Sequence, residues 1–179
     1  AVSYPTKCKS MSLSATTDGI FKKDYYKYID EDIPADSYLW LKPGDILIQR
    51  SNSLEKVGVS AIYTGEEHEY IYPDLMMKLQ VDNQNDFKYI NYFLQRVETR
   101  AYFLSNATGI AGNMPKINQK TVSNTPVDYP SLVEQHEIVA ILDRLLGREE
   151  EARQSAESVL ASIDRMKQAI LARAFRGEL

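Results

Sequence analysis

The chain has 179 residues, of which 44% are hydrophobic and 26% charged, a globular composition that excludes a disordered chain. No run approaches the roughly 18 apolar residues that a membrane-spanning helix needs, so we expect no membrane association. A net charge of −4 argues against a protein that holds nucleic acid by bulk charge, although it allows a local basic surface. Cys8 is the only cysteine, which excludes an internal disulfide and fits a reducing cytoplasm.

The first 131 residues predict an α+β domain with a mixed sheet. Pro43 and Gly44 preset a turn. The runs that follow are rich in β-branched and aromatic residues, as strands are. They cover residues 46–50, 57–63, 70–72 and 75–81.

A helix, a polar loop and a short strand are predicted next. Asp86 can cap a helix that runs to about Leu104 and carries one apolar face. Residues 105–119 form a polar loop that contains two glycines, and residues 125–129 fit an edge strand that tolerates Pro126. The apolar face of this helix consists of Tyr89, Ile90, Phe93, Leu94, Val97, Ala101 and Leu104.

The composition changes sharply near residue 131, because all 12 Tyr and all 7 Pro precede it. Ser131 and Glu134 then form a capping box, which predicts the start of a helix. We therefore predict two parts, a globular domain over residues 1–131 and a long C-terminal helix over residues 132–179.

Apolar and small residues recur along this helix at steps of four and three, which is the pattern of a coiled coil. A helix packed back on its own domain is the alternative, but small residues in the middle of the stripe favour close approach by a second helix. We call the predicted contact residues the seam. They are Ile138, Leu142, Leu145, Ala152, Ala156, Val159, Ile163, Met166 and Ile170.

Motifs for phosphate cradles, dinucleotide binding and zinc sites are absent, so the sequence predicts no catalytic residue and no metal site. One pattern resembles a metal-dependent nuclease, in which Asp74, Asp86 and Lys88 would surround Mg²⁺. The alternative interpretation makes Asp74 a surface acid and Asp86 a helix cap. A Mg²⁺-dependent nuclease and a coiled-coil adaptor without DNA binding therefore stay open as competing functions.

Three polar segments have the chemistry for reading a DNA duplex. Arginine and lysine donate to guanine, asparagine and glutamine pair with adenine, and lysine and serine hold phosphate. Polar loop residues are more often simply solvated, so each segment alone is weak evidence. The predicted DNA-binding residues are Lys7, Lys9, Ser10, Arg50, Ser51, Asn52, Ser53, Asn113, Lys116, Asn118, Gln119 and Lys120.

Four strings of the sequence are more specific together than any one alone. They are Leu41-Lys-Pro-Gly-Asp-Ile-Leu-Ile-Gln-Arg-Ser-Asn-Ser53 with Val57-Gly58, Ala107-Thr-Gly-Ile-Ala-Gly-Asn-Met-Pro-Lys-Ile-Asn118, Pro130-Ser-Leu-Val-Glu-Gln135 with Ile138-Val-Ala-Ile-Leu142, and Gln168-Ala-Ile-Leu-Ala-Arg-Ala-Phe-Arg-Gly-Glu-Leu179. In this order they resemble the specificity subunits of type I restriction–modification systems, from about residue 4 to the end.

The resemblance implies a non-catalytic subunit whose recognition domain reads one half of a bipartite double-stranded DNA target. It implies that modification subunits dock on the helix and that restriction subunits join through the complex. S-adenosylmethionine, ATP and Mg²⁺ are then expected on the partner subunits, with no cofactor bound by this chain.

The usual subunit carries two recognition domains and two helical regions, whereas this chain carries one of each. The resemblance therefore leaves two alternatives, a half-length subunit and the C-terminal half of a longer one. In either case we expect two copies to pair antiparallel through the seam as a homodimer.

Overall fold

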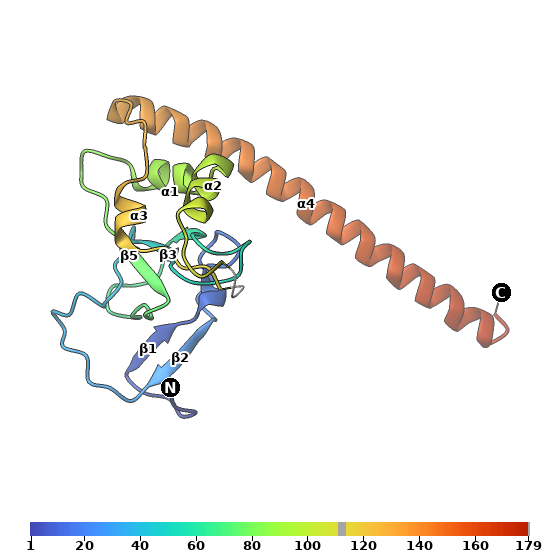
Figure 1. Ribbon diagram of the computed structural model, residues 1–179. Coiled ribbons are helices and arrows are strands. Elements are labelled where there is room, and N and C mark those ends of the chain that lie inside the picture. Colours follow the sequence, from blue (N-terminus) through green and yellow to red (C-terminus); the bar gives the residue numbers. More distant parts are fainter. Residues whose placement is uncertain (111–113, 179) are drawn as a thin grey trace. The chain divides into compact units, whose positions relative to one another are not determined.

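The computed structural model describes residues 1–110 and 114–178, which form two compact units (Figure 1). The first unit comprises residues 1–136 and the second residues 137–179. The long helix begins at residue 132, so the compact boundary lies just inside it. The predicted functional division between residues 131 and 132 stays a prediction.

Two short strands form the first sheet. β1 (Cys8–Met11) and β2 (Tyr26–Ile29) pair antiparallel, with Cys8 opposite Ile29. The sequence prediction missed both strands. In β2 a usable signal existed, because Tyr26 and Tyr28 alternate with the exposed Lys27, as expected of a half-buried strand.

The second sheet has three antiparallel strands in the order β4-β3-β5. They are β3 (Ile46–Gln49), β4 (Ser60–Ile62) and β5 (Met76–Leu79). All four residues of β3 are buried, which confirms the buried strand that the sequence predicts there. The turn before β3 is also confirmed, since Gly44 has a φ of 92°.

The core of the first unit is formed by residues of β1, β3 and β5 together with residues of the segments that connect the strands. Seven of its residues are buried together, and Gln49 is buried beside them with its amide nitrogen bonded to the carbonyl oxygen of Leu13 at 2.8 Å. A buried polar group that is bonded in this way does not penalise the fold. The seven core residues are Met11, Ala15, Leu41, Leu47, Tyr63, Tyr70 and Met76.

The predicted single helix over residues 86–104 is wrong, because two helices occupy this stretch. Asp86 caps α1 (Phe87–Gln95) as expected, and its carboxylate accepts the backbone N–H groups of Lys88 at 2.7 Å and Tyr89 at 3.1 Å. α2 (Val97–Ser105) then starts after Arg96, whose ψ of 147° leaves the helical region. The Thr99 hydroxyl donates to the carbonyl of Phe93 at 2.8 Å and bridges the break.

This break rotates the second helix, so its predicted apolar face is wrong too. Val97 is 80% exposed and Ala101 is exposed, whereas Thr99 and Phe103 are buried. A continuous helix would have kept the first pair on the core side. The extended residue at position 96 resets the angular position of everything that follows.

Between the helices, the structure differs from the predicted loop and strand. A short helix that the sequence did not predict, α3 (Gln119–Ser123), follows Asn118. The predicted edge strand over residues 125–129 is wrong, since these residues have no regular structure. Pro126 and Pro130, which lack a backbone N–H, do not favour strand pairing here.

The capping box at the start of the long helix is confirmed. The Ser131 N–H donates to the Glu134 carboxylate at 2.9 Å, and the Glu134 N–H donates to the Ser131 hydroxyl oxygen at 3.4 Å. From there α4 (Leu132–Phe175) runs without interruption, including at Gly147. At 1.5 Å per residue its length is about 66 Å.

The observed class is α+β, with small antiparallel sheets followed by a long helix, which confirms the predicted fold class. Ser10 and Ile71 add a single-residue parallel bridge to these sheets. Within residues 1–110 and 114–178, no helix has both the length and the apolar character to cross a membrane.

Candidate nucleic-acid interface

Main-chain hydrogen bonds bring two of the predicted DNA-binding segments together. Arg50 follows the last residue of β3, and its carbonyl oxygen accepts the N–H of Ile117 at 2.9 Å. Ser51 and Lys116 form an antiparallel bridge one residue further along. Segments 50–53 and 116–120, more than sixty residues apart in the chain, therefore lie side by side.

A second bridge closes the loop that leads into this contact. The N–H of Thr108 donates to the carbonyl of Lys116 at 2.9 Å, and the N–H of Lys116 donates to the carbonyl of Thr108 at 2.8 Å. The backbone of Lys116 is thus held on two sides, while the residue is exposed. Asn113, another predicted contact, lies outside the described residues.

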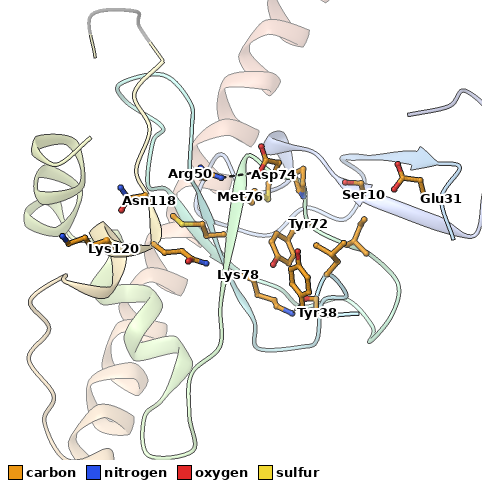
Figure 2. A pocket seen from close by; sticks show the side chains of 15 residues that line it. Ser10, Glu31, Tyr38, Arg50, Tyr72, Asp74, Met76, Lys78, Asn118 and Lys120 are labelled. Atoms are coloured by element: carbon orange, nitrogen blue, oxygen red, sulfur yellow. Dashed lines mark hydrogen bonds and ion pairs between the residues drawn. The ribbon is translucent and has the colours of Figure 1, made fainter. Parts of the chain in front are cut away.

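A cavity of about 920 Å³ opens beside these segments, and we call it the Arg50 cavity (Figure 2). Arg50, Asn118, Gln119 and Lys120 line it, and Ser10 reaches it from β1. The other side chains that line it were not predicted as contacts. They are Glu31, Tyr38, Leu39, Ile71, Tyr72, Pro73, Asp74, Met76, Met77 and Lys78.

Lys78 fixes one wall of the Arg50 cavity. Its ammonium donates to the carbonyl oxygens of Tyr38 at 2.6 Å and Trp40 at 3.0 Å, and it lies 3.8 Å from Asp45. Both charged side chains are almost buried, at 10% and 5% exposure. Lys78 is therefore a structural cation that holds the 38–40 segment against β5.

The rim of the cavity carries an ion pair. The Nη1 atom of the Arg50 guanidinium lies 3.4 Å from the carboxylate of Asp74 (Figure 2). The Arg50 side chain is 45% exposed and that of Asp74 is 95% exposed. Asp74 belongs to a turn in which the N–H of Met76 donates to the carbonyl of Pro73 at 2.9 Å. Both Arg50 and Asp74 therefore belong to segments whose backbone is fixed by hydrogen bonds.

Asn118, Gln119 and Lys120 lie at the start of α3. The Asn118 side-chain oxygen caps the helix by accepting the N–H of Thr121 at 2.9 Å, which leaves its amide nitrogen as a donor. All three residues are exposed. The arrangement supplies amide and ammonium donors along one side of the cavity.

Tyr72 adds a phenol to the opposite wall. Burial raises the pKa of Tyr72 above its usual value, with smaller contributions from Tyr38 and Asp45. The phenol therefore stays protonated at neutral pH and can donate a hydrogen bond.

Two predicted contacts have internal roles. Ser51 is buried, and among the described residues its hydroxyl has no hydrogen-bond partner. The Asn52 amide donates to the side-chain oxygen of Gln49 at 2.6 Å, while its own oxygen accepts the N–H of Ser53 at 2.8 Å. These side chains shape the loop, and Ser53 is exposed beside them.

The N-terminal basic stretch lies apart from this chemistry except at Ser10. Lys7 is exposed and does not line the Arg50 cavity. The Lys9 ammonium lies 5.0 Å from the ring of Tyr26 and 3.8 Å from the carboxylate of Glu69. The Lys9 ammonium therefore already interacts with a ring on the neighbouring strand and with a carboxylate.

The nuclease interpretation finds no support in this geometry. Asp86 caps α1 and lies 3.4 Å from His136, whereas Asp74 pairs with Arg50. Across the described ranges, no cluster of three or more His, Cys, Asp or Glu residues could hold a metal ion.

The second unit presents most of its seam to solvent. Val159, Ile163 and Met166 are 54–62% exposed, and every residue from 151 to 178 is exposed. Ile138, Leu145 and Ile170 are also exposed, at 37–51%. Leu142 is half-buried, while Ala152 and Ala156 are exposed.

Comparison with known proteins identifies the family to which this chain belongs. Residues 12–157 match the family model of the type I restriction modification DNA specificity domain. The specificity subunit of the type I restriction enzyme EcoKI, from Escherichia coli strain K12, is 30% identical over 141 residues. That of EcoDI, from Escherichia coli, is 46% identical over 66 residues.

These matches cover different shares of the proteins. The EcoKI match spans 78% of this chain and 30% of that subunit, and the EcoDI match spans 37% and 15%. The chain thus matches less than a third of the length of these relatives.

The fold is shared more widely than the sequence. A solved chain from work on complex assembly and conformational transition of the type I R-M system superposes with a TM-score of 0.71 at 20% identity. The superposition covers 99% of this chain and 42% of the solved chain. With the family model matched over residues 12–157, this chain belongs to the type I restriction modification DNA specificity domain family.

Proposed function

We propose that this chain is the DNA-recognition component of a type I restriction–modification complex. Residues 1–131 bind double-stranded DNA and read one half of a bipartite target. Family membership supports this function. The observation that carries it is the Ser51–Lys116 bridge, which joins two separately predicted contact segments beside one cavity.

The residues around the Arg50 cavity divide by chemistry. Arg50, Asn118 and Gln119 have donors suited to base edges, as does Lys116 on the adjoining bridge, whereas Lys120 suits phosphate. Main-chain bonds hold the backbone of Arg50 and Lys116 in place before DNA arrives, so no backbone freedom is lost there on binding. This fixed backbone supports direct reading of bases by these side chains.

The net charge of −4 predicts that the isolated chain binds DNA weakly. Phosphate contacts supply most non-specific affinity, and this chain offers few of them. We infer that modification subunits supply the remaining phosphate contacts. Binding by the chain alone should then be weak and salt-sensitive, and binding by the complex much tighter.

The long helix serves assembly in this proposal. Modification subunits dock on α4, and two copies of the chain pair antiparallel through the seam, so that the dimer reads an interrupted inverted repeat. The exposure of Val159, Ile163 and Met166 supports a missing helical partner. The chain itself is non-catalytic and acts in the cytoplasm, with S-adenosylmethionine, ATP and Mg²⁺ held by the modification and restriction subunits.

Mapping of methylated sites in genomic DNA tests this function. Cells that express the modification subunits should methylate a bipartite sequence only when this chain is present. Arg50→Ala or Lys116→Ala should abolish site selection without unfolding the protein, because both residues are exposed. Lys27→Ala removes an exposed lysine from β2 and serves as the matched control, with unchanged site selection.

Two results would contradict the proposal. The first is unchanged site preference in both the Arg50→Ala and the Lys116→Ala variants, which would remove the assigned surface. The second is the absence of any DNA retardation by the chain together with its modification partner, which would favour a coiled-coil adaptor.

A further inference from the structure

Asp74 is an unexpected residue on a surface that binds DNA. Its carboxylate is 95% exposed at the rim of the Arg50 cavity, where it would repel phosphate. It has no metal to bind, since no cluster of metal-ligating side chains occurs among residues 1–110 and 114–178. A carboxylate in this place needs another role.

The backbone around Asp74 and Arg50 is well anchored. The N–H of Arg50 donates to the carbonyl of Leu75 at 2.8 Å, so the residue after Asp74 is bound directly to Arg50. The opposite side of Arg50 is held by the bond from Ile117. The two side chains therefore project from one rigid unit, with 3.4 Å between their charged groups.

Together these groups match the major-groove edge of a G·C pair. Guanine presents two acceptors, N7 and O6, to which an arginine donates, and cytosine presents an amino donor, N4, which a carboxylate accepts. Donor and acceptor stand side by side on the base pair, as they do on the protein. An exposed ion pair contributes little to stability, so opening it around a base pair costs little.

We propose that Arg50 and Asp74 jointly read one G·C pair of the half-site, with Arg50 on guanine and Asp74 on the cytosine amino group. Asp74 is then a specificity-determining residue that rejects bases without an amino donor. Its charge also weakens binding to DNA in general, so it lowers affinity for wrong sequences. This inference rests on the proposed function and assigns a base preference to the same surface.

Selection from a randomised half-site library, with the chain assembled with its modification subunits, tests this assignment. The unaltered complex should require one G·C pair. Asp74→Ala should lower discrimination at that one position by about 5- to 150-fold and leave the other positions unchanged. Retention of non-specific DNA should rise with Asp74→Ala, because a repelling charge is removed.

Asp36→Ala is the matched control. It removes another exposed aspartate whose own side chain does not line the Arg50 cavity, so base preferences should stay as they are. Thermal unfolding of both variants should match the unaltered chain, since both side chains are exposed.

The two levels of the proposal fail differently. If the unaltered complex selects no sequence, the proposed function falls, and this inference falls with it. If it selects a sequence in which no position depends on Asp74, or in which no G·C pair is required, only the role of Asp74 is overturned.

Discussion

The two units of this chain differ in how far their apolar side chains are buried: the first has a buried core, and most apolar residues of the second are exposed. In residues 1–136, Leu41, Leu47 and Tyr63 are completely buried, and the buried Gln49 finds its partners within the same unit. In residues 137–178, Val159 is 59% exposed and Met166 is 62% exposed. Both units carry apolar residues in a regular pattern, but in the second unit every residue from 151 to 178 is exposed.

This contrast separates two tasks. A unit whose backbone is internally bonded can hold Arg50 and Asp74 in fixed positions, which base reading requires. A helix with exposed apolar residues at heptad spacing gains stability only when a partner covers them. Recognition is therefore expected to survive changes in the helix, and assembly to survive changes around the Arg50 cavity.

The largest expected effect comes from placing acids in the seam. Val159→Asp combined with Ile163→Asp would bury two carboxylates in the proposed antiparallel pair, and each buried, unpaired charge costs several kcal/mol. We expect association to weaken by at least about 100-fold, measured as a change from dimer to monomer mass by light scattering.

The control for this experiment places the same charges elsewhere on the helix. Gln154→Asp with Ala161→Asp adds two acids on the side of α4 opposite the seam, so the dimer should persist. A monomer mass for the unaltered chain at micromolar concentration would contradict seam pairing itself. Equal weakening by both pairs of substitutions would show that charge, and not the seam, decides the result.

A pair of glycine substitutions sharpens the comparison next. Gly58 has a φ of 75°, and an added Cβ would approach Phe103 to 2.5 Å. Gly58→Ala should therefore destabilise the first unit by about 2–5 kcal/mol, since it combines a left-handed conformation with overpacking.

Gly147 is the counterpart in the helix. An added Cβ there meets nothing within 4 Å, so Gly147→Ala should stabilise α4 by about 0.5–1 kcal/mol through helix propensity alone. Thermal melting followed by circular dichroism measures both effects. A stabilising Gly58→Ala would mean that Phe103 is not packed as described.

The smallest effect concerns the start of α4. Hydrogen bonds from the hydroxyl and backbone N–H of Ser131 lower the pKa of Glu134 in the folded state. The cap therefore stabilises the helix above the usual glutamate pKa of about 4.5 and loses that contribution as the pH falls through the lowered value. Carbon chemical shifts of residues 131–134 should show fraying in acid, and Glu134→Gln should remove this pH dependence. An unchanged midpoint in the glutamine variant would assign the fraying to another group.

Local signals in the sequence predicted the elements that depend on neighbouring residues. The Asp86 cap, the capping box at Ser131 and the buried strand β3 are all confirmed, because each follows from side-chain chemistry within a few residues. Two of the three predicted contact segments, 50–53 and 116–120, also lie side by side. Whether they touch DNA stays a prediction.

Elements that depend on distant partners were not predicted. The break at Arg96 involves no glycine or proline, and the bond between Thr99 and Phe93 that bridges it becomes visible only in the fold. Ser51 looked like a surface hydroxyl but lies inside, because its backbone pairs with Lys116. The Arg50 cavity is assembled from several separate segments, so no local pattern could have identified Tyr38 or Tyr72 as part of it.

The way in which Arg50 is held has an evolutionary consequence. Its position is fixed by main-chain bonds to Leu75 and Ile117, which any residue other than proline could form in its place. Under the proposed function, single substitutions at this position would therefore change which base is preferred without disturbing the scaffold. Asn118 is less replaceable, since its side chain also caps α3. New specificities are therefore expected to arise first at position 50, because the fold tolerates different side chains there.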